Sequence, residues 1–140
     1  MSLSLKIVTP ERIVFEDTVD SATLMTESGE ITVLQNHVPL VTNLRAGEVR
    51  LKKGNEEYSL VASTGFLEVR PGNQIIILAD TAERAEELEL EKIKEAKERA
   101  QKLLTETRQA DDVAFANAAA LFERELARYR VAMKHHKRRA

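Results

Sequence analysis

The sequence lacks several residue types on which common kinds of functional site depend. It contains no cysteine, which excludes disulfides, thiolate metal sites and cysteine nucleophiles. Tryptophan is absent and aromatic residues make up only 4% of the chain, so a folded core has to be largely aliphatic. No run approaches the roughly 20 apolar residues of a membrane-spanning helix, and the first residues lack the apolar centre of a signal peptide. We therefore expect a protein that is neither exported nor inserted into a membrane.

Motifs for catalysis and metal binding are missing as well. The sequence has no glycine-rich phosphate loop followed by lysine, no HExxH pattern and nothing that resembles a nucleophile elbow. The three histidines are His37, His135 and His136. The last two are adjacent, so on a helix they would point about 100° apart and would not easily share a metal. We predict a non-catalytic protein with no metal and no tightly bound cofactor.

The formal net charge of -2 hides an uneven distribution of charge. Residues 124–139 carry seven lysines and arginines and only one acid, Glu125, which gives this segment +6 and leaves -8 for the rest of the chain. A basic end can bind nucleic acid, but Tyr129 is the only aromatic residue in it for base stacking, and acids dominate elsewhere. An acidic protein partner and a plain solvated helix face remain as alternatives. We expect protein partners and no nucleic acid.

Up to about residue 80 the sequence consists of short β-type segments separated by turn signals. Leu3, Leu5 and Ile7 alternate with polar residues, which is the period of a strand with one buried face. The pair Gly54-Asn55 is a hairpin turn signal. This pattern predicts an antiparallel β-sandwich over residues 1–83. The expected strands cover residues 3–9, 20–27, 30–35, 39–44, 48–53, 56–63, 65–70 and 73–79.

From residue 82 onward the sequence contains neither glycine nor proline and is rich in strong helix formers. It predicts an antiparallel hairpin of two helices over residues 84–140, with a break near 105–112 and Asp111 or Asp112 as N-cap of the second helix. The fold class is therefore α+β. Apolar residues that recur at helical spacing define the expected contact stripes: Ile93, Ala96, Ala100 and Leu103 in the first helix, and Phe115, Ala119, Phe122, Leu126, Tyr129 and Met133 in the second.

Alanine makes up about half of the first stripe, so little apolar surface would be buried between the two helices. Such a hairpin is marginally stable alone and easily separated. A pair of helices that can come apart is a candidate conformational switch.

Two stretches carry a resemblance to a known family. They are SGEITVLQNHVPLVTNLRAGEVRL at 28–51 and STGFLEVRPGNQIIILADTAERAEEL at 63–88. Together they resemble the epsilon subunit of bacterial F-type ATP synthases, and the opening LKIVTPERIVFEDTV is also similar to the first strands of that family. The resemblance covers nearly the whole chain in order.

The resemblance implies a non-catalytic part of the central rotor, at the cytoplasmic face of the cell membrane. In that family the sandwich binds the gamma subunit and sits on the ring of c subunits. The two helices either fold onto the sandwich or extend along gamma into the catalytic head, where they inhibit ATP hydrolysis. The alternative is a stand-alone protein-binding module with a basic helical tail.

The resemblance also implies contact residues at two places. Glu30 and His37 match loops at the end of the sandwich that faces the polar loops of the c ring and contacts gamma. For His37 the alternative is a turn residue that is hydrogen-bonded to the backbone. On the second helix, basic residues would face acidic segments of the catalytic beta subunits and the neighbouring alpha subunits; the candidates are Arg124, Arg128, Arg130 and Lys134.

Some bacterial relatives bind ATP in the folded helices through an Ile/Leu-Asp-x-x-Arg-Ala motif. In the matching stretch, LELEKI, Leu88 fits, but Glu89, Lys92 and Ile93 replace the aspartate, arginine and alanine. Lysine lacks the forked donors of arginine that grip a phosphate. The supporting positions are matched by Glu83, Arg99, Arg124 and Arg128, the last two only if the loop between the helices has two extra residues. We therefore expect ATP to be at most a weak regulatory ligand.

Overall fold

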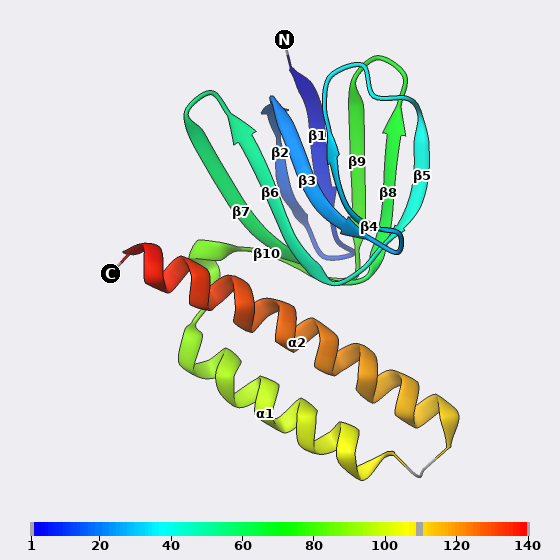
Figure 1. Cartoon of the computed structure of the whole chain (residues 1–140), viewed down its shortest axis with the longest axis vertical. Helices are drawn as coiled ribbons and strands as arrows, with labels where there is room; N and C mark the ends of the chain where they lie inside the picture. The colour runs from blue at the N-terminus through cyan, green and yellow to red at the C-terminus, as the bar shows by residue number, and fades with distance from the viewer. Residues whose placement is uncertain (1, 109–110, 140) are drawn as a thin grey trace.

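The structure is a computed structural model that describes residues 2–108 and 111–139. Ten strands form a β-sandwich, and two long helices lie side by side across one end of it (Figure 1). The strands are β1 Leu3–Val8, β2 Ile13–Val19, β3 Ser21–Thr26, β4 Gly29–Val33, β5 Leu40–Leu44, β6 Gly47–Lys53, β7 Glu56–Ala62, β8 Gly65–Arg70, β9 Gln74–Ala79 and β10 Ala82–Arg84. A short 3-10 turn, η1 Ala85–Glu87, leads to the helices α1 Leu90–Glu106 and α2 Asp112–Arg139.

The strands follow one another in the order β10-β7-β6-β3-β5-β8-β9-β1-β2. β4 is not part of this order; it pairs with the edge of β3 opposite β5 and β6. β3 and β5 are joined by a single residue pair, Thr26 with Leu44, so the sheet folds over there into two layers. The predicted sandwich is confirmed. One correction applies to its strand directions, because β1 and β9 run parallel whereas the sequence pattern predicts an antiparallel fold throughout.

All eight expected strands are present, and the pattern alone missed β2 and β10. β2 carries Glu16 and Asp17, which are residue types that strands disfavour. β2 is the last strand of the order, so its outward side chains reach solvent. There Glu16 pairs with Lys6 at 3.5 Å and Asp17 pairs with Lys53 at 2.8 Å. β10 continues the sheet one residue past the expected boundary at residue 83.

The space between the layers is filled by aliphatic side chains, as the alternation predicts. Leu3, Leu5 and Ile7 are all buried. Gly65 is required by a close approach of two strands, because a Cβ there would lie 1.9 Å from the Leu78 carbonyl oxygen. Gly54, with φ of +61°, opens the two-residue turn between β6 and β7, so the predicted hairpin is confirmed.

The two helices are antiparallel neighbours (Figure 1), as predicted. Asp111 caps α2, since its carboxylate accepts a hydrogen bond from the Ala114 backbone N–H at 2.8 Å. Residues 109–110 of the predicted break lie outside the described residues.

The predicted contact stripes are only partly right. Ile93 and Ala100 of α1 are buried, but Leu103 and Phe115 are each 39% exposed. None of the buried residues of α2 belongs to the stripe predicted for it: they are Ala118, Glu125, Ala127, Val131 and Ala132. The physical reason is that α2 contacts both α1 and the sandwich, whereas a single stripe assumes one partner.

Candidate functional site

The most informative region is the seam between α2 and the sandwich. Its apolar part is a cluster of Val61, Ala85, Ala127 and Val131, with Ala46 and Leu88 packed against it. Most of these side chains are small, so the cluster buries little apolar area and stabilises the contact only modestly. The sandwich has its own, separate core of larger aliphatic side chains.

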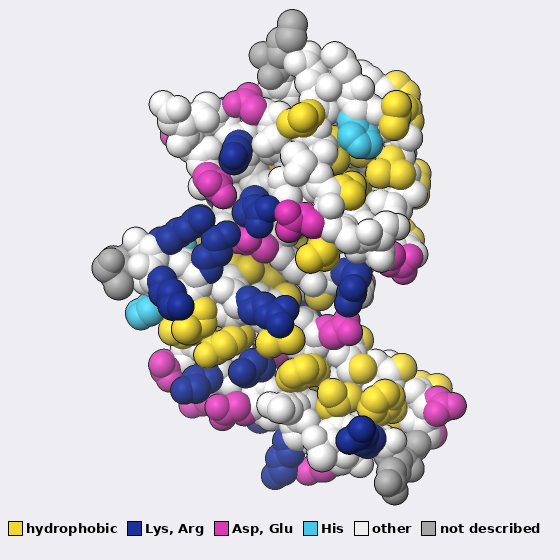
Figure 2. Space-filling view, viewed as in Figure 1, with side chains coloured by type: hydrophobic (Ala, Val, Ile, Leu, Met, Phe, Trp, Pro, Cys, Tyr) yellow, Lys and Arg dark blue, Asp and Glu magenta, His cyan; other side chains and the backbone are white. Residues whose placement is uncertain are grey.

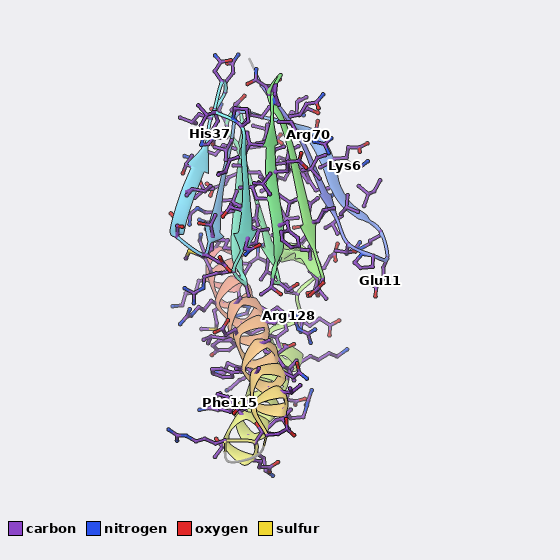
Figure 3. All side chains as sticks on the ribbon, turned by 90° about the vertical axis from the view of Figure 1, so that its right-hand side faces the viewer. Lys6, Glu11, His37, Arg70, Phe115 and Arg128 are labelled. Carbon is purple, nitrogen blue, oxygen red and sulfur yellow. The ribbon has the colours of Figure 1, made fainter. Side chains whose placement is uncertain are left out.

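Two ion pairs cross the same seam. Arg128 donates from Nε and from Nη2 to the two carboxylate oxygens of Glu83, at 2.7 and 3.1 Å. Lys134 donates to both oxygens of Glu48, at 2.9 and 3.0 Å. In Figure 3, Arg128 lies where α2 passes under the strands. Two of the four cations expected to dock on a partner are thus bound to the sandwich of the same chain.

Glu48 is the more highly connected of the two sandwich carboxylates. Besides Lys134 it accepts hydrogen bonds from Ser59 at 2.6 Å and from Arg50 at 3.3 Å. Burial by itself would raise the pKa of Glu48, but the hydrogen bonds from Ser59 and Lys134 outweigh it, and the pKa lies below its ordinary value. Glu48 therefore stays ionised at neutral pH and keeps its attraction for Lys134.

Glu125 is the buried centre of a second cluster of charges, and its side chain is only 3% exposed. Oε1 accepts from Arg124 Nε and Nη2, at 3.2 and 2.9 Å, and Oε2 accepts from Arg128 Nη1 at 2.7 Å. Burial would lower the pKa of Arg128, but hydrogen bonds and charge attraction from Glu83 and then Glu125 raise it above its usual value. Arg128 is thus held between two carboxylates.

Sequence reasoning missed both Glu48 and Glu125 as partners of the basic helix. Glu125 did carry a signal, since it is the only acid in segment 124–139 and has an arginine before it and another three residues later. Glu48 carried none, because Lys134 is 86 residues away along the chain.

A hollow of about 240 Å³ adjoins this seam and contains Glu30 in its lining, together with Met25, Arg130 and Lys134. Figure 2 shows lysine and arginine side chains gathered over this part of α2 and the adjoining edge of the sandwich, with acids among them. Glu30 is paired there with Arg50 at 3.0 Å. Arg130 makes no ion pair within the described part of the chain.

His37 lies in the loop between β4 and β5, at the end of the sandwich far from the helices (Figure 3). Its backbone N–H donates to the Leu34 carbonyl at 3.1 Å, and its ring Nδ1 lies 2.7 Å from the Val38 carbonyl oxygen. This is the geometry of the alternative in which His37 is a turn residue held by the backbone. The structure does not bring Glu30 and His37 together.

The residues expected around a nucleotide fall into separate groups. Glu83 is bound to Arg128, and Leu88 packs against the apolar seam. Arg99 and Arg124 line one hollow of about 230 Å³ between the helices, together with Glu125. Glu89 and Lys92 instead pair with each other at 2.9 Å on the exposed start of α1.

Exposed apolar side chains form a second surface, on the outer face of the sandwich. Phe66 and Leu78 are partners across β8 and β9, and Val8 connects Leu78 to Ile13 on β2. Phe66, Leu78 and Ile13 are each about half exposed. A shallow hollow of about 320 Å³ is lined by Phe66, Leu78 and Val8. We call the row Phe66–Leu78–Val8–Ile13 the outer apolar row.

Within residues 2–108 and 111–139, no group of three or more histidines or acids is arranged to hold a metal ion. Neither of the described long helices is apolar enough over a sufficient length to cross a membrane.

Comparison with known proteins identifies the family. The model of the family "ATP synthase, Delta/Epsilon chain, beta-sandwich domain" matches residues 2–85. The chain is also 44% identical over 135 residues to the ATP synthase epsilon chain of Dehalococcoides mccartyi, in a match that covers 96% of this chain and 95% of that one. This chain belongs to the ATP synthase epsilon-chain family. As an epsilon chain it is a non-catalytic subunit of ATP synthase, which the sequence resemblance implied.

Other relatives and two solved structures agree. The epsilon chain of Anoxybacillus flavithermus is 45% identical over 103 residues, covering 74% of this chain and 76% of that one. A chain of the Euglena gracilis mitochondrial ATP synthase, in a structure of OSCP, F1 and c-ring, has a TM-score of 0.76 at 23% identity and covers 90% of this chain and 78% of that one. A chain of the central stalk and c-ring of the Tetrahymena thermophila enzyme has a TM-score of 0.54 at 13% identity and covers 62% and 69%. These two likenesses concern the fold.

Proposed function

We propose that this epsilon chain is a rotor subunit that joins the catalytic head to the membrane ring, and that its helical hairpin is a detachable arm that inhibits ATP hydrolysis. The observation that supports the arm best is the character of the seam. A few small apolar side chains and two ion pairs hold α2 on a sandwich that has a complete core of its own. Loss of those contacts would leave the sandwich folded.

The proposed inhibitory contact uses the cations of α2. Arg124, Arg128 and Lys134 are bound to acids of the same chain in the folded form. When the hairpin leaves the sandwich, Arg128 loses Glu83 and Lys134 loses Glu48. These two side chains and Arg130 become available to acidic segments of the beta and alpha subunits; Arg124 keeps Glu125, because both lie on the same helix. The same cations cannot hold both sets of acids, so attachment and inhibition exclude each other. Docking of this kind weakens with added salt.

The sandwich would supply the rotor contacts. The loop that carries His37 also exposes Leu34 and Val38, at the end far from the helices. This loop is our candidate for contact with the polar loops of the c ring. The outer apolar row is our candidate for the surface that binds gamma, since exposed apolar surface of this kind favours a protein partner. Glu30 lies beside α2 instead, so we assign it to the seam in the folded form. In this role the chain is peripheral, at the cytoplasmic face of the cell membrane as part of the complex.

Truncation tests the arm. A chain that ends after Leu88 keeps the ten strands and η1, and it is expected to assemble with the other subunits but to raise the ATP hydrolysis rate of the assembled head. Co-purification with gamma serves as the control for assembly. Unchanged hydrolysis by a correctly assembled, truncated enzyme would remove the inhibitory function.

Charge neutralisation tests the docking. Replacing Arg124, Arg128, Arg130 and Lys134 by glutamine is expected to relieve inhibition, even though it also frees α2 from the sandwich. The matched control replaces four exposed cations elsewhere in the hairpin, Lys92, Lys94, Lys102 and Arg108. A fully inhibited α2 variant, or equal relief by the control, argues against electrostatic docking through α2.

A further inference from the structure

The loop between β4 and β5, residues 34–39, is tied to the turn between β8 and β9; we call it the His37 loop. The backbone N–H of Asn36 donates to the side-chain oxygen of Asn73 at 2.7 Å, and we call this hydrogen bond the loop clamp. Figure 1 shows the loop and the turn side by side, at the end of the sandwich far from the helices. Among the hydrogen bonds of residues 2–108 and 111–139, the loop clamp is the one that joins residues 34–39 to another segment.

The acceptor side of the loop clamp is itself fixed. The carbonyl oxygen of Asn73 accepts from the Ser4 N–H, at the start of β1, at 2.8 Å. Asn73 has φ of +60° and follows Gly72 with φ of +83°, a left-handed conformation that glycine, asparagine and aspartate adopt most readily. Because a backbone N–H can only donate, the side-chain amide of Asn73 has to present its oxygen to Asn36. The turn therefore offers an acceptor of defined position and orientation.

The donor side depends on this external bond. Asn36 also lies in the left-handed region, with φ of +64°, which is unfavourable for a residue that carries a side chain. Within the loop, the His37 N–H donates to the Leu34 carbonyl at 3.1 Å, and the His37 ring Nδ1 lies 2.7 Å from the Val38 carbonyl oxygen. These internal bonds set the shape of the loop but not its position relative to the sandwich. The bond to Asn73 sets that position.

We propose that Asn73 is a positioning residue that holds the His37 loop in one conformation for its protein partner. The loop exposes the apolar side chains of Leu34 and Val38. A loop that is ordered beforehand loses less conformational entropy when it binds, so the loop clamp raises affinity without a contact between Asn73 and the partner. This inference rests on the proposed function in taking the polar loops of the c ring as that partner. The loop clamp itself can be measured in the isolated chain.

Two substitutions of Asn73 separate the hydrogen bond from the backbone conformation. Asn73→Gly keeps the left-handed φ but removes the side-chain acceptor, whereas Asn73→Asp keeps an acceptor oxygen and tolerates the same φ. Asn55→Gly is the matched control, because it makes the same change in the exposed turn between β6 and β7. All three are made in the full chain, and circular dichroism checks that each one folds as wild type does.

The first measurement is the hydrogen-exchange rate of the Asn36 amide in the isolated chain, resolved by NMR. Asn73→Gly is expected to accelerate exchange about tenfold, the factor that corresponds to the loss of one ordinary hydrogen bond. Asn73→Asp and Asn55→Gly are expected to exchange at nearly the wild-type rate. Unchanged exchange in Asn73→Gly, or equal acceleration in Asn73→Asp, would overturn the inference.

The second measurement is the affinity of the chain, in complex with gamma, for the purified c ring. Asn73→Gly is expected to weaken binding about threefold or more, and Asn73→Asp to restore it. Wild-type affinity in an Asn73→Gly chain whose Asn36 amide exchanges faster would contradict the positioning role. Leu34→Ser with Val38→Ser tests the partner separately: if this double variant binds the ring as wild type does, the loop is not the ring contact, and the Asn36 exchange rates then decide whether Asn73 holds the loop.

Discussion

Val131 gives the sharpest measure of how weakly the hairpin is held. It is 3% exposed and belongs to the small apolar cluster between α2 and the sandwich, not to the sandwich core. Val131→Ala removes two buried methyl groups, which cost about 1.6 kcal/mol at about 0.8 kcal/mol each. We expect the ratio of detached to attached hairpin to rise on the order of tenfold, since 1.4 kcal/mol is a factor of about ten.

The measurement is a distance distribution between two spin labels in the isolated chain. Because the sequence has no cysteine, Lys52→Cys on the sandwich and His136→Cys on α2, both at exposed positions, would be the only thiols. The attached form gives a short distance and the detached form a broad, longer one. Val131→Ala is expected to move population from the first to the second.

Val113→Ala is the matched control, because it makes the same chemical change on the same helix at a position that is 70% exposed. Val113→Ala gains the same helix propensity as Val131→Ala, but it loses no buried apolar surface. Equal distributions for Val131→Ala and Val113→Ala would refute the assignment of this cluster as the apolar part of the attachment. The assignment would also be refuted if Val131→Ala lowered the free energy of unfolding of the sandwich by a comparable amount, because Val131 is not part of the sandwich core.

Three further predictions concern individual contacts. The pKa of Glu48 in the folded chain lies below its ordinary value, so its pairing with Lys134 stabilises attachment above the ordinary pKa and is lost as the pH falls through the lowered one. The same spin-label distances should show detachment growing as the pH falls below about 4.5, and Glu48→Gln should flatten that dependence. An unchanged dependence would exclude Glu48. Asp111→Ala removes the N-cap of α2 and should cost about 1 kcal/mol, seen as faster hydrogen exchange in the first turn of α2; Asp112→Ala, which removes only a charge near the helix start, should cost less, and the reverse order would contradict the cap. Gly65→Ala places a Cβ 1.9 Å from the Leu78 carbonyl oxygen. We expect it to lower the free energy of unfolding of the sandwich by about 3 kcal/mol in chemical denaturation. An unchanged free energy of unfolding would show that β8 and β9 can separate there at little cost.

The parts of the fold that could be predicted are those governed by neighbours in the sequence. Short segments of β-type residues between turn signals located eight strands, Gly54 located a hairpin turn, and Asp111 was one of the two aspartates predicted to cap α2. β2 escaped because its acidic residues suit an edge strand whose outer face is solvated, which a pattern of local propensity does not register. The parallel pairing of β1 with β9 depends on segments about seventy residues apart, and no local pattern carries that information.

The candidate site divides in the same way. The basic character of α2 is visible in the sequence, and the lone Glu125 within it marks the centre of the arginine cluster. The partners that hold α2 down, Glu48 and Glu83, belong to strands distant in sequence, so their roles required the fold. The predicted stripe on α2 was incomplete because the helix has two partners, and the positions that face the sandwich lie off a stripe drawn for one.

The detachable arm can be tested most directly by fastening it. Ala46 and Ala127 line the same hollow at the seam, so Ala46→Cys with Ala127→Cys permits a short thiol crosslinker to hold α2 on the sandwich in a chain without other thiols. ATP hydrolysis is then measured in the assembled enzyme before and after crosslinking, with each single-cysteine chain as control. We expect the crosslinked enzyme to hydrolyse ATP faster, because the arm can no longer reach the head. Equal rates before and after complete crosslinking would contradict the proposal that movement of this hairpin inhibits the enzyme.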